Sequence, residues 1–595
     1  MYCDRPIGLF RFMVKNKFHF IMIKPSHYDD DGYVIQFYRS AMPSNTLATL
    51  HGLAEDCRKR GVLGDDVDMR FTAIDETNKR VRVRKLIGQI KRDGGTSLVG
   101  LIGVQSNQFP RALDLARQFR TAGIQVCIGG FHVSGCLAML PGLTGELQEA
   151  LDIGVSLFAG EAEGRLETVL KDAWEGELKP LYNYMLELPA LEDAPTPNLD
   201  AKVLKRTGGS QASFDAGRGC PYLCSFCTII NVQGRKSRFR SADDIEKIMR
   251  ANYEQGIRRF FISDDNFARN QNWEAIFDRI IELRGKIGDD INLVLQVDTA
   301  CHRIPDFIEK AARAGTKRVF IGLENINPES LKGALKGQNR ITDYRKMLQE
   351  WRSHKVITTA GYILGFPNDT PESIVRDIEI IKRELPIDIL EFFFLTPLPG
   401  SADHKRLLEQ GVVMDPDLNK YDLSHVTTGH NRMTSEDWQR AYRLAWDTFY
   451  SHEHCVTLLR RARASGIHVG KIVGTITWFY GSILYEGVHP LESGIFRMKH
   501  RCDRRPGLPL ENPLLFYPKY WGNLVYKICC LTRLFYTYQP IRRKLDRLPP
   551  PVMENDVALK PVDVEELDQL QLYQVSDAAR AAADKAQRRA ANQAR

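Results

Sequence analysis

The sequence lacks an uninterrupted apolar run long enough to span a bilayer. Its most apolar segment, KIVGTITWFYGSILYE (471–486), has 14 uncharged residues between Lys471 and Glu486, whereas a transmembrane helix needs about 20. The N-terminus lacks the continuous apolar stretch of a secretory signal peptide, because charges interrupt it. We therefore expect a cytoplasmic protein whose contact with a membrane, if there is one, is peripheral.

The sequence also lacks a disulfide framework and an evenly spread excess of charge. Its twelve cysteines are scattered apart from one loop, which favours a reducing compartment. The net charge is +8, yet residues 494–548 alone hold twelve Lys and Arg against three Asp and Glu. The basic character therefore belongs to one C-terminal patch.

What the sequence does contain is a close group of three cysteines in the run GRGCPYLCSFC, namely Cys220, Cys224 and Cys227. A closed structural zinc site normally takes four nitrogen or sulfur ligands. Three thiolates suit a 4Fe–4S cluster that keeps one iron free of protein ligands, where a small molecule can bind and be cleaved. A zinc knuckle or an incidental cysteine cluster is the alternative.

The order of apolar strands and amphipathic helices predicts an α/β architecture. Residues 1–180 alternate buried-type strands with helices, which predicts a doubly wound, Rossmann-like parallel sheet with its ligand at the carboxyl ends of the strands. A polar linker at 181–204 precedes a second βα series over 205–405. About six βα units in that length predict a partial (β/α)6 barrel with active residues at the strand ends. We expect a mostly helical C-terminal domain over 406–550 and a flexible tail over 551–595.

The cysteine loop, the aromatic Phe226 and the later loops GLEN (322–325), GYILGFPNDT (361–370) and LTPLPGS (395–401) together resemble the radical S-adenosylmethionine (SAM) superfamily. The resemblance covers about residues 205–405. It implies that Cys220, Cys224 and Cys227 each ligate one iron of a 4Fe–4S cluster and that SAM is reductively cleaved to a 5′-deoxyadenosyl radical. It implies that Phe226 lies against the adenine and that Glu324 and Asp298 contact SAM, although either acidic residue could instead cap a loop. An external electron donor of the flavodoxin or ferredoxin type is also implied.

The N-terminal half resembles the cobalamin-binding domain of one large class of radical SAM enzymes. The loop IGGFHVSG (128–135) matches that class's GG-x-H-x-[TS] pattern. The resemblance implies a cobalamin site whose residues are Gly129, Gly130, His132, Ser134 and, in the preceding loop, Gln105. The stretch PSHYDDDG departs from the D-x-H-x-x-G motif of methionine-synthase-like proteins, so His27 is not expected to be an axial cobalt ligand. A vestigial domain that binds nothing is the alternative.

Together these resemblances imply a cobalamin-dependent radical SAM enzyme, most often a C-methyltransferase of an unactivated carbon in a small-molecule substrate. A second hypothesis keeps the radical and replaces methylation by cyclisation, rearrangement or oxidation. A third is a non-catalytic cofactor-binding or assembly protein, against which the intact cysteine motif argues.

The C-terminal patch interleaves aromatic and basic residues in LLFYPKYWGNLVYK (514–527) and CCLTRLFYTYQPIRRK (529–544). Three interpretations stay open: ordinary core aromatics of a capping subdomain, an interfacial surface that meets membrane lipid, and nucleic-acid binding. No recognisable module supports the last, so no nucleic-acid partner is expected. The lipid interpretation makes the substrate apolar, such as a polyprenoid or a tetrapyrrole-like molecule.

Overall fold

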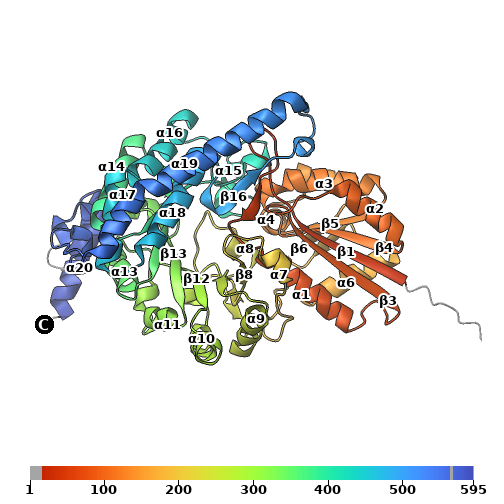
Figure 1. Ribbon diagram of the computed structural model, residues 1–595, viewed down its shortest axis with the longest axis horizontal. Helices are drawn as coiled ribbons and strands as arrows, with labels where there is room; N and C mark the ends of the chain where they lie inside the picture. Colours follow the sequence, from red (N-terminus) through yellow and green to blue (C-terminus); the bar gives the residue numbers. More distant parts are fainter. Residues whose placement is uncertain (1–15, 563–566, 594–595) are drawn as a thin grey trace, which may run out of the picture.

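Two six-stranded parallel sheets form the body of the protein (Figure 1). The computed structural model describes residues 16–562 and 567–593. The first sheet has the strand order β3-β1-β4-β5-β6-β7. Its strands are β1 (Asn16–Lys24), β3 (Val67–Asp75), β4 (Thr96–Leu101), β5 (Gln125–Gly129), β6 (Ser156–Ala159) and β7 (Leu181–Asn183). The last of these lies within the segment expected to be a linker, and it pairs with β6.

Helices cover both faces of this first sheet, which confirms the doubly wound arrangement. One face carries α1 (Asn45–Lys59) and α6 (Leu166–Glu175); the other carries α2 (Val83–Asp93), α3 (Phe109–Thr121) and α5 (Gly145–Asp152). Strands covered on both faces need apolar side chains in both directions. Accordingly, residues 18–23 of β1 are all buried.

The second sheet is an open, partial barrel with the order β15-β14-β13-β12-β11-β8, so that β8 and β15 are its two edges. Its strands are β8 (Gln211–Phe214), β11 (Arg259–Ile262), β12 (Asn292–Val297), β13 (Thr316–Glu324), β14 (Ile357–Leu364) and β15 (Ile389–Phe394). Its helices are α9 (Ala242–Glu254), α10 (Trp273–Ile287), α11 (Phe307–Arg313), α12 (Pro328–Gly333), α13 (Ile341–Ser353) and α14 (Pro371–Glu384). A short hairpin of β9 (Gly217–Arg218) and β10 (Arg238–Phe239) flanks the cysteine loop, which ends at α8 (Ile229–Val232). The short α7 (Ala201–Leu204) precedes β8.

Helices of the C-terminal region cover the β15 side of the barrel. They are α16 (Ser435–Phe449), α17 (His452–Ala464), α18 (Val469–Gly481) and the 35-residue α19 (Pro513–Arg547). The preceding helix α15 (Ala402–Glu409) lies beside the cysteine loop. Trp438 and Trp446 of α16 are buried against β15, so part of this region's aromatic content is core. Within residues 16–562 and 567–593, no helix combines the length and the apolar character that crossing a membrane requires.

Two C-terminal segments return to earlier parts of the chain. β16 (Gly494–Met498) pairs antiparallel with β2 (Gln36–Ser40), which follows β1. α20 (Asp577–Gln593) packs beside α13, with Ala579 and Ala583 buried. Part of the segment expected to be a flexible tail therefore lies on the barrel.

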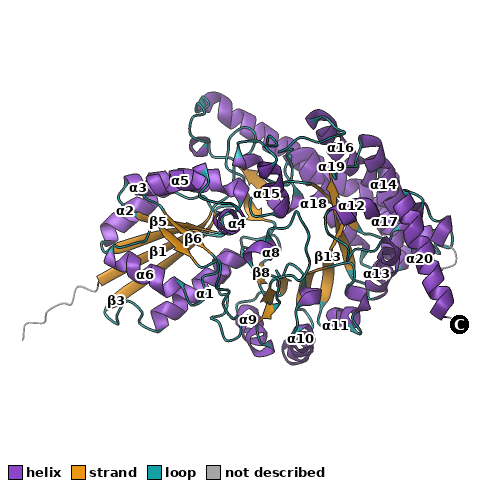
Figure 2. Ribbon diagram, turned by 180° about the vertical axis from the view of Figure 1, so that it is seen from behind, coloured by secondary structure: helices purple, strands orange, loops and turns teal. Residues whose placement is uncertain are grey.

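The two halves of the protein meet through a close backbone contact between segments that follow their strands. α4 (Phe131–Met139) of the first half contacts α8 of the second, near the middle of the view in Figure 2. A Cβ atom at Gly400, whose φ is +101°, would lie 2.6 Å from the Cα atom of Gly135 on α4. Only glycines permit this approach, and it brings the strand ends of both sheets to one place.

Candidate active site

A cavity of about 850 Å³ lies where the carboxyl ends of both sets of strands converge. Its wall combines loops of the first sheet, loops of the barrel and two C-terminal segments. Among the residues that line it are Gln105, Gly129, Gly130, Ser134, Glu161, Arg218, Phe226, Asp265, Glu324, Phe393, Asp422 and Glu492. Parallel α/β sheets bind their ligands at this end, and here two such sites are merged into one space.

The cysteine loop is held in place beside this cavity. Cys224 is buried, whereas Cys220 and Cys227 are partly exposed. Ser225 N donates to Ala334 O at 3.1 Å, and Asp403 N donates to Ser225 O at 3.0 Å. The cavity wall includes the neighbouring Phe226 and Thr228 but none of the three cysteines.

The chemistry of these thiols fits a metal cluster. Burial raises the pKa of Cys227 to about 12, with the nearby Asp265 acting in the same direction. A thiolate at this position therefore needs a cationic partner. An iron ion held by these cysteines would supply that charge, because metal ligation requires the deprotonated thiolate. Gln338 Nε2 donates to Cys224 Sγ at 3.5 Å, the kind of contact that orients a ligating sulfur.

Phe226 and Glu324 both line the cavity, as a contact with SAM would require. Glu324 is the last residue of β13, beside a register shift, and has a φ of +64°. Non-glycine residues adopt this conformation at a cost, and such residues cluster at functional sites. Glu324 forms an ion pair with Lys336, whose Nζ lies 5.6 Å from the centroid of the Phe226 ring.

Asp298 is placed differently, because its carboxylate is fully engaged away from the cavity wall. It accepts hydrogen bonds from Arg269 Nε at 2.6 Å, from Asn266 Nδ2 at 2.8 Å and from the hydroxyl of Tyr222 at 3.1 Å. Burial opposes ionisation of Asp298, but Arg269 outweighs it and holds its pKa below the ordinary value. Through Tyr222, Asp298 braces the cysteine loop.

Four of the five residues expected around cobalamin line the cavity: Gln105, Gly129, Gly130 and Ser134. Ser134 Oγ accepts a hydrogen bond from Gly160 N at 3.0 Å and so ties the loops after β5 and β6 together. Gly130 has a φ of +153°, and a Cβ there would lie 2.1 Å from Val104 N. Glycine is therefore required at position 130 because any side chain there would clash with the backbone of Val104.

His132 is the exception. Its ring is fully buried, and its Nε2 lies 3.2 Å from Glu146 Oε1 while Nδ1 lies 3.1 Å from Ser106 Oγ. Burial lowers the pKa of His132, but Cys136 and Glu146 outweigh it and raise the pKa to about 9. His132 is not among the residues that line the cavity. Its contacts instead hold α4 in position against Glu146 and Ser106.

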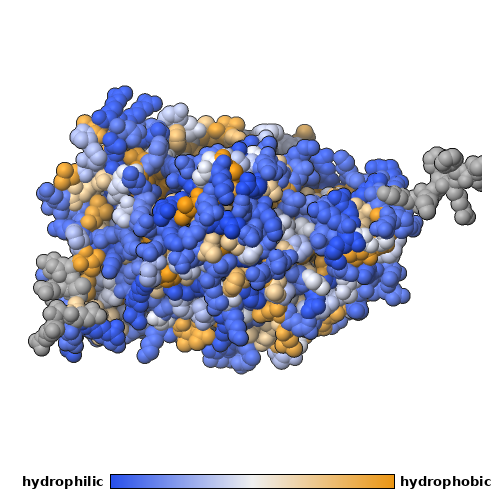
Figure 3. All heavy atoms as spheres, turned by 90° about the horizontal axis from the view of Figure 1, so that it is seen from below, coloured by the Kyte–Doolittle hydropathy of each residue, from blue (hydrophilic) through white to orange (hydrophobic). Residues whose placement is uncertain are grey.

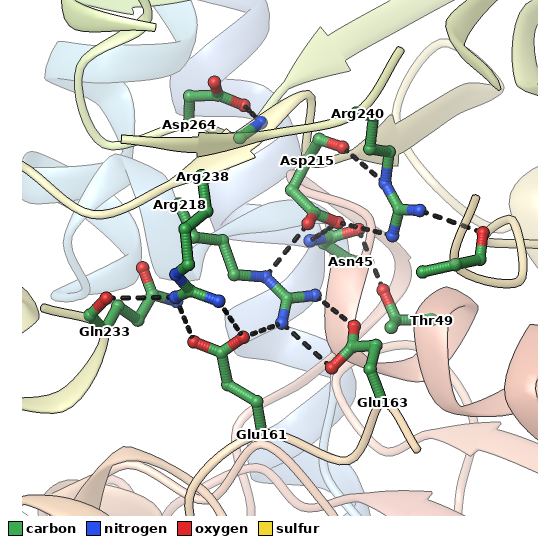
Figure 4. A network of polar contacts seen from close by, with 12 residues as sticks. Asn45, Thr49, Glu161, Glu163, Asp215, Arg218, Gln233, Arg238, Arg240 and Asp264 are labelled. Carbon is green, nitrogen blue, oxygen red and sulfur yellow. Dashed lines mark hydrogen bonds and ion pairs between the residues drawn. The ribbon is translucent and has the colours of Figure 1, made fainter. Parts of the chain in front are cut away.

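Sequence reasoning missed an ion-pair network that joins the two halves (Figure 4). Arg218 Nη1 donates to Glu161 Oε2 at 2.7 Å, Nη2 to Glu163 Oε1 at 2.6 Å, and Nε to Asp215 Oδ2 at 2.9 Å. Arg238 Nη1 donates to Glu161 Oε2 at 2.8 Å. The only sequence signal was the pair of acids in GEAEG (160–164), whose partners lie more than fifty positions away.

The two aspartates after β11 have separate roles in the structure. Asp264 Oδ1 accepts hydrogen bonds from Ala216 N at 2.7 Å and Gly217 N at 2.9 Å, so it holds the start of the β9 strand. Asp265 lines the cavity. Burial raises the pKa of each to about 7.

Comparisons with known proteins agree with this architecture. The sequence model of the Radical SAM superfamily matches residues 215–381. The chain is 29% identical over 276 residues to the bacteriochlorophyllide d C-12(1)-methyltransferase of Chlorobaculum tepidum, covering 45% of this chain and 59% of that protein. It is 26% identical to the bacteriochlorophyllide d C-8(2)-methyltransferase of the same organism, with 58% of this chain and 75% of that protein covered. A hopanoid C-2 methylase of Rhodopseudomonas palustris is 25% identical, with 53% and 58% covered.

Solved structures show the same fold over more of the chain. The radical SAM methyltransferase TsrM from Kitasatospora setae, with cobalamin and a [4Fe–4S] cluster bound, is 16% identical with a TM-score of 0.51, covering 66% of this chain and 78% of that one. The cobalamin-dependent SAM radical enzyme OxsB, with aqua-cobalamin and SAM bound, is 13% identical with a TM-score of 0.51, covering 92% and 83%. Residues 215–381 are thus similar to the radical SAM superfamily, and the fold of the chain is similar to the folds of TsrM and OxsB. The chain spans about three fifths of the length of the first bacteriochlorophyllide methyltransferase.

Proposed function

We propose that this protein is a cobalamin-dependent radical SAM enzyme that C-methylates an unactivated carbon. The observation that carries the proposal is the shared cavity: loops of the doubly wound half and SAM-side residues of the barrel face the same space. When bound, the 4Fe–4S cluster, SAM and cobalamin supply a 5′-deoxyadenosyl radical and a transferable methyl group, chemistry that belongs to the cofactors. The protein's task is to bind them, orient them and exclude water.

Each group of residues in and around the cavity has its own task in this proposal. Cys220, Cys224 and Cys227 ligate three irons of the cluster, while Phe226 and Glu324 hold the adenine and a polar group of SAM. Gln105, Gly129, Gly130 and Ser134 form the cobalamin surface. Asp298 and His132 act as positioning residues for the cysteine loop and for α4. An external flavodoxin- or ferredoxin-type donor supplies electrons.

A second candidate function follows from one relative that is named as a cyclase and not as a methyltransferase. The chain is 25% identical over 247 residues to an anaerobic magnesium-protoporphyrin IX monomethyl ester cyclase of Synechocystis. A radical cyclisation or oxidation would use the same cavity without net methyl transfer. The two functions differ in their SAM products. Methylation yields S-adenosylhomocysteine together with 5′-deoxyadenosine, whereas the alternative yields 5′-deoxyadenosine alone.

We propose an apolar small-molecule substrate of the lipid or tetrapyrrole type. The relatives named above act on bacteriochlorophyllide or hopanoid according to their names. The cavity wall includes Ile363, Phe393, Phe394 and Leu395, which suit an apolar ligand. Incubation of the reconstituted protein with methyl-labelled SAM and with chlorin, hopanoid or polar acceptors tests this. Label in the chlorin or hopanoid supports the proposal, and label only in the polar acceptors contradicts it.

We also propose that α19 docks on an anionic membrane surface. Leu514, Tyr517, Trp521, Val525 and Ile528 recur at helical spacing and therefore lie in one stripe. All five are exposed, Leu514 by 82% and Trp521 by 57%. In Figure 1 the N-terminal end of α19 projects beyond the body on the upper side.

The charge around α19 matches this partner. Within α19 the basic residues are Lys519, Lys527, Arg533, Arg542, Arg543, Lys544 and Arg547, against the single acidic Asp546. Apolar and aromatic residues interleaved with Lys and Arg are typical of interfacial helices on anionic lipid. The face on the lower side of Figure 1, shown in Figure 3, is by contrast predominantly hydrophilic with small scattered apolar groups.

A further inference from the structure

A second group of potential ligands lines the cavity, apart from the cysteine loop. It consists of His27, Asp422 and Glu492. His27 follows β1, Asp422 follows α15, and Glu492 precedes β16, so three distant parts of the chain contribute one residue each. Their ligand atoms all lie within 4.8 Å of one another.

The imidazole of His27 has an unused nitrogen in this group. His27 is only 3% exposed, and its Nε2 has no hydrogen-bond partner. The Nε2 lies 3.7 Å from Glu492 Oε2 and 4.0 Å from Asp422 Oδ2. Both separations exceed hydrogen-bond length. A buried nitrogen that points at two carboxylates without bonding to either leaves room for a cation between them.

The separations are close to those of a coordinated ion. Nitrogen and carboxylate ligands sit about 2.0–2.2 Å from a divalent transition metal, which places neighbouring ligand atoms about 3 to 3.5 Å apart. A small inward movement of the three side chains therefore completes the geometry. One imidazole with two carboxylates suits Mn²⁺, Fe²⁺ or Zn²⁺.

Supporting contacts hold the two carboxylates in place. Asn107 Nδ2 donates to Glu492 Oε1 at 3.1 Å and leaves Oε2 directed at His27. Asp422 Oδ1 accepts from Ser424 N at 2.8 Å, and Asp422 Oδ2 lies 2.8 Å from His425 Nδ1. Orienting bonds of this kind accompany metal ligands.

Two nearby cations are engaged with acids outside the group, and a third, His425, is shared with one acid outside it. Lys24 Nζ lies 3.7 Å from Asp75, and Arg497 Nη2 lies 2.9 Å from Asp29. His425 is shared between Asp422 and Asp30. The carboxylates of buried Asp422 and partly buried Glu492, beside an imidazole whose Nε2 has no hydrogen-bond partner, thus favour an added positive charge.

We propose that His27, Asp422 and Glu492 bind one divalent first-row transition-metal ion in the cavity wall. Its remaining coordination positions face the cavity, where they take an oxygen atom of the substrate and so orient it. The ion is separate from the cluster at Cys220, Cys224 and Cys227.

Manganese binding tests the proposal without SAM cleavage. The full chain, with its cluster reconstituted and loose metal removed by a chelator, is titrated with Mn²⁺ while the EPR signal of free Mn²⁺ is followed. We expect one bound ion per chain. His27→Ala and Glu492→Gln should each raise the dissociation constant about 100-fold, since even supporting contacts are worth 10- to 100-fold. His430→Gln is the matched control, because that histidine bonds Phe366 O at 2.9 Å, outside the group, and should leave binding unchanged.

Pulsed EPR of the bound ion identifies the histidine. We expect coupling to a coordinated ¹⁴N nucleus in the wild type and in Glu492→Gln, and its loss in His27→Ala. Absence of saturable binding below about 1 mM, absence of nitrogen coupling in the wild type, or equal affinities in wild type and both variants would overturn the proposal. Since none of these measurements involves turnover, their outcome is independent of whether the protein methylates its substrate.

Discussion

Arg218 Nη1 lies 2.7 Å from Glu161 Oε2, and this contact links the barrel to the doubly wound half at the edge of the cavity. Both side chains are at least nine-tenths buried. The same guanidinium also serves Glu163 and Asp215, so one side chain compensates three acids. Removing it takes from Glu163 its ion-pair partner, while Glu161 keeps Arg238.

Arg218→Met should therefore destabilise the protein by about 3 kcal/mol or more, as loss of one partner of a buried ion pair typically does. The urea midpoint of unfolding measures the effect. Arg165→Gln removes an ion pair with Glu187 that is much more exposed than the pair of Arg218 with Glu161, and it should cost no more than about 1 kcal/mol. Equal shifts in the two variants would show that the network does not hold the halves together.

Glu324→Gln should weaken SAM binding about tenfold, because a hydrogen bond to a charged group contributes about 1.5–3 kcal/mol. Equilibrium dialysis of SAM against the anaerobic, cluster-loaded protein gives the dissociation constant. Glu329→Gln changes an exposed carboxylate on the adjacent α12 and should have no effect. An unchanged affinity in Glu324→Gln would leave Glu324 as a loop residue held by Lys336.

His132 should act on stability, with no direct part in holding cobalamin. Its pKa is raised from 6.5 to about 9 in the folded protein. Its contribution to stability is therefore complete below about pH 6.5 and is lost as the pH rises through about 9. We expect the stability difference between wild type and His132→Gln to shrink by about 3 kcal/mol from pH 6 to pH 10, as followed by urea unfolding.

The same variant tests the cofactor role expected from the sequence. His132→Gln should retain cobalamin like the wild type, whereas Gln105→Trp, which places a bulky ring in the cavity wall, should retain less. Cobalamin is quantified by absorbance after gel filtration. Loss of cobalamin in His132→Gln with a normal unfolding profile would restore His132 as a direct contact.

The double substitution Trp521→Asp with Val525→Asp should abolish most binding to vesicles that contain anionic lipid, because it places charge within the exposed stripe of α19. Sedimentation with vesicles of mixed neutral and anionic phospholipid measures binding. Leu186→Asp is the control, since Leu186 is 99% exposed and lies in a loop far from α19 in the sequence. Equal vesicle binding by both variants would argue against a membrane surface at α19.

Much of the fold could be predicted because it rests on local signals. Apolar runs predict the buried parallel strands, and the close spacing of the three cysteines predicts the position of the cysteine loop. The strand β7, at 181–183, could not be predicted because three residues carry no periodicity. Packing of α20 depends on α13, more than two hundred residues earlier, and no local pattern reveals it.

The direction of individual side chains was the weaker part of the prediction. His132 and Ser134 belong to one motif, but α4 is helical and residues two apart do not share a face. Ser134 therefore faces the cavity while His132 meets Glu146 of α5. The direction of the Asp298 carboxylate is likewise set by Arg269 and Tyr222, which only folding brings close to it.

The most direct test of the central claim is the formation of 5′-deoxyadenosine by the anaerobically reconstituted, cobalamin-loaded protein under reductant, compared with Cys224→Ala. We predict that the wild type cleaves SAM and that Cys224→Ala forms no 5′-deoxyadenosine while retaining cobalamin, with Cys529→Ala, an exposed cysteine on α19, behaving like the wild type. A wild-type protein that holds an intact cluster but neither cleaves SAM nor binds cobalamin would contradict the account. It would identify the chain as a non-catalytic scaffold of the same fold.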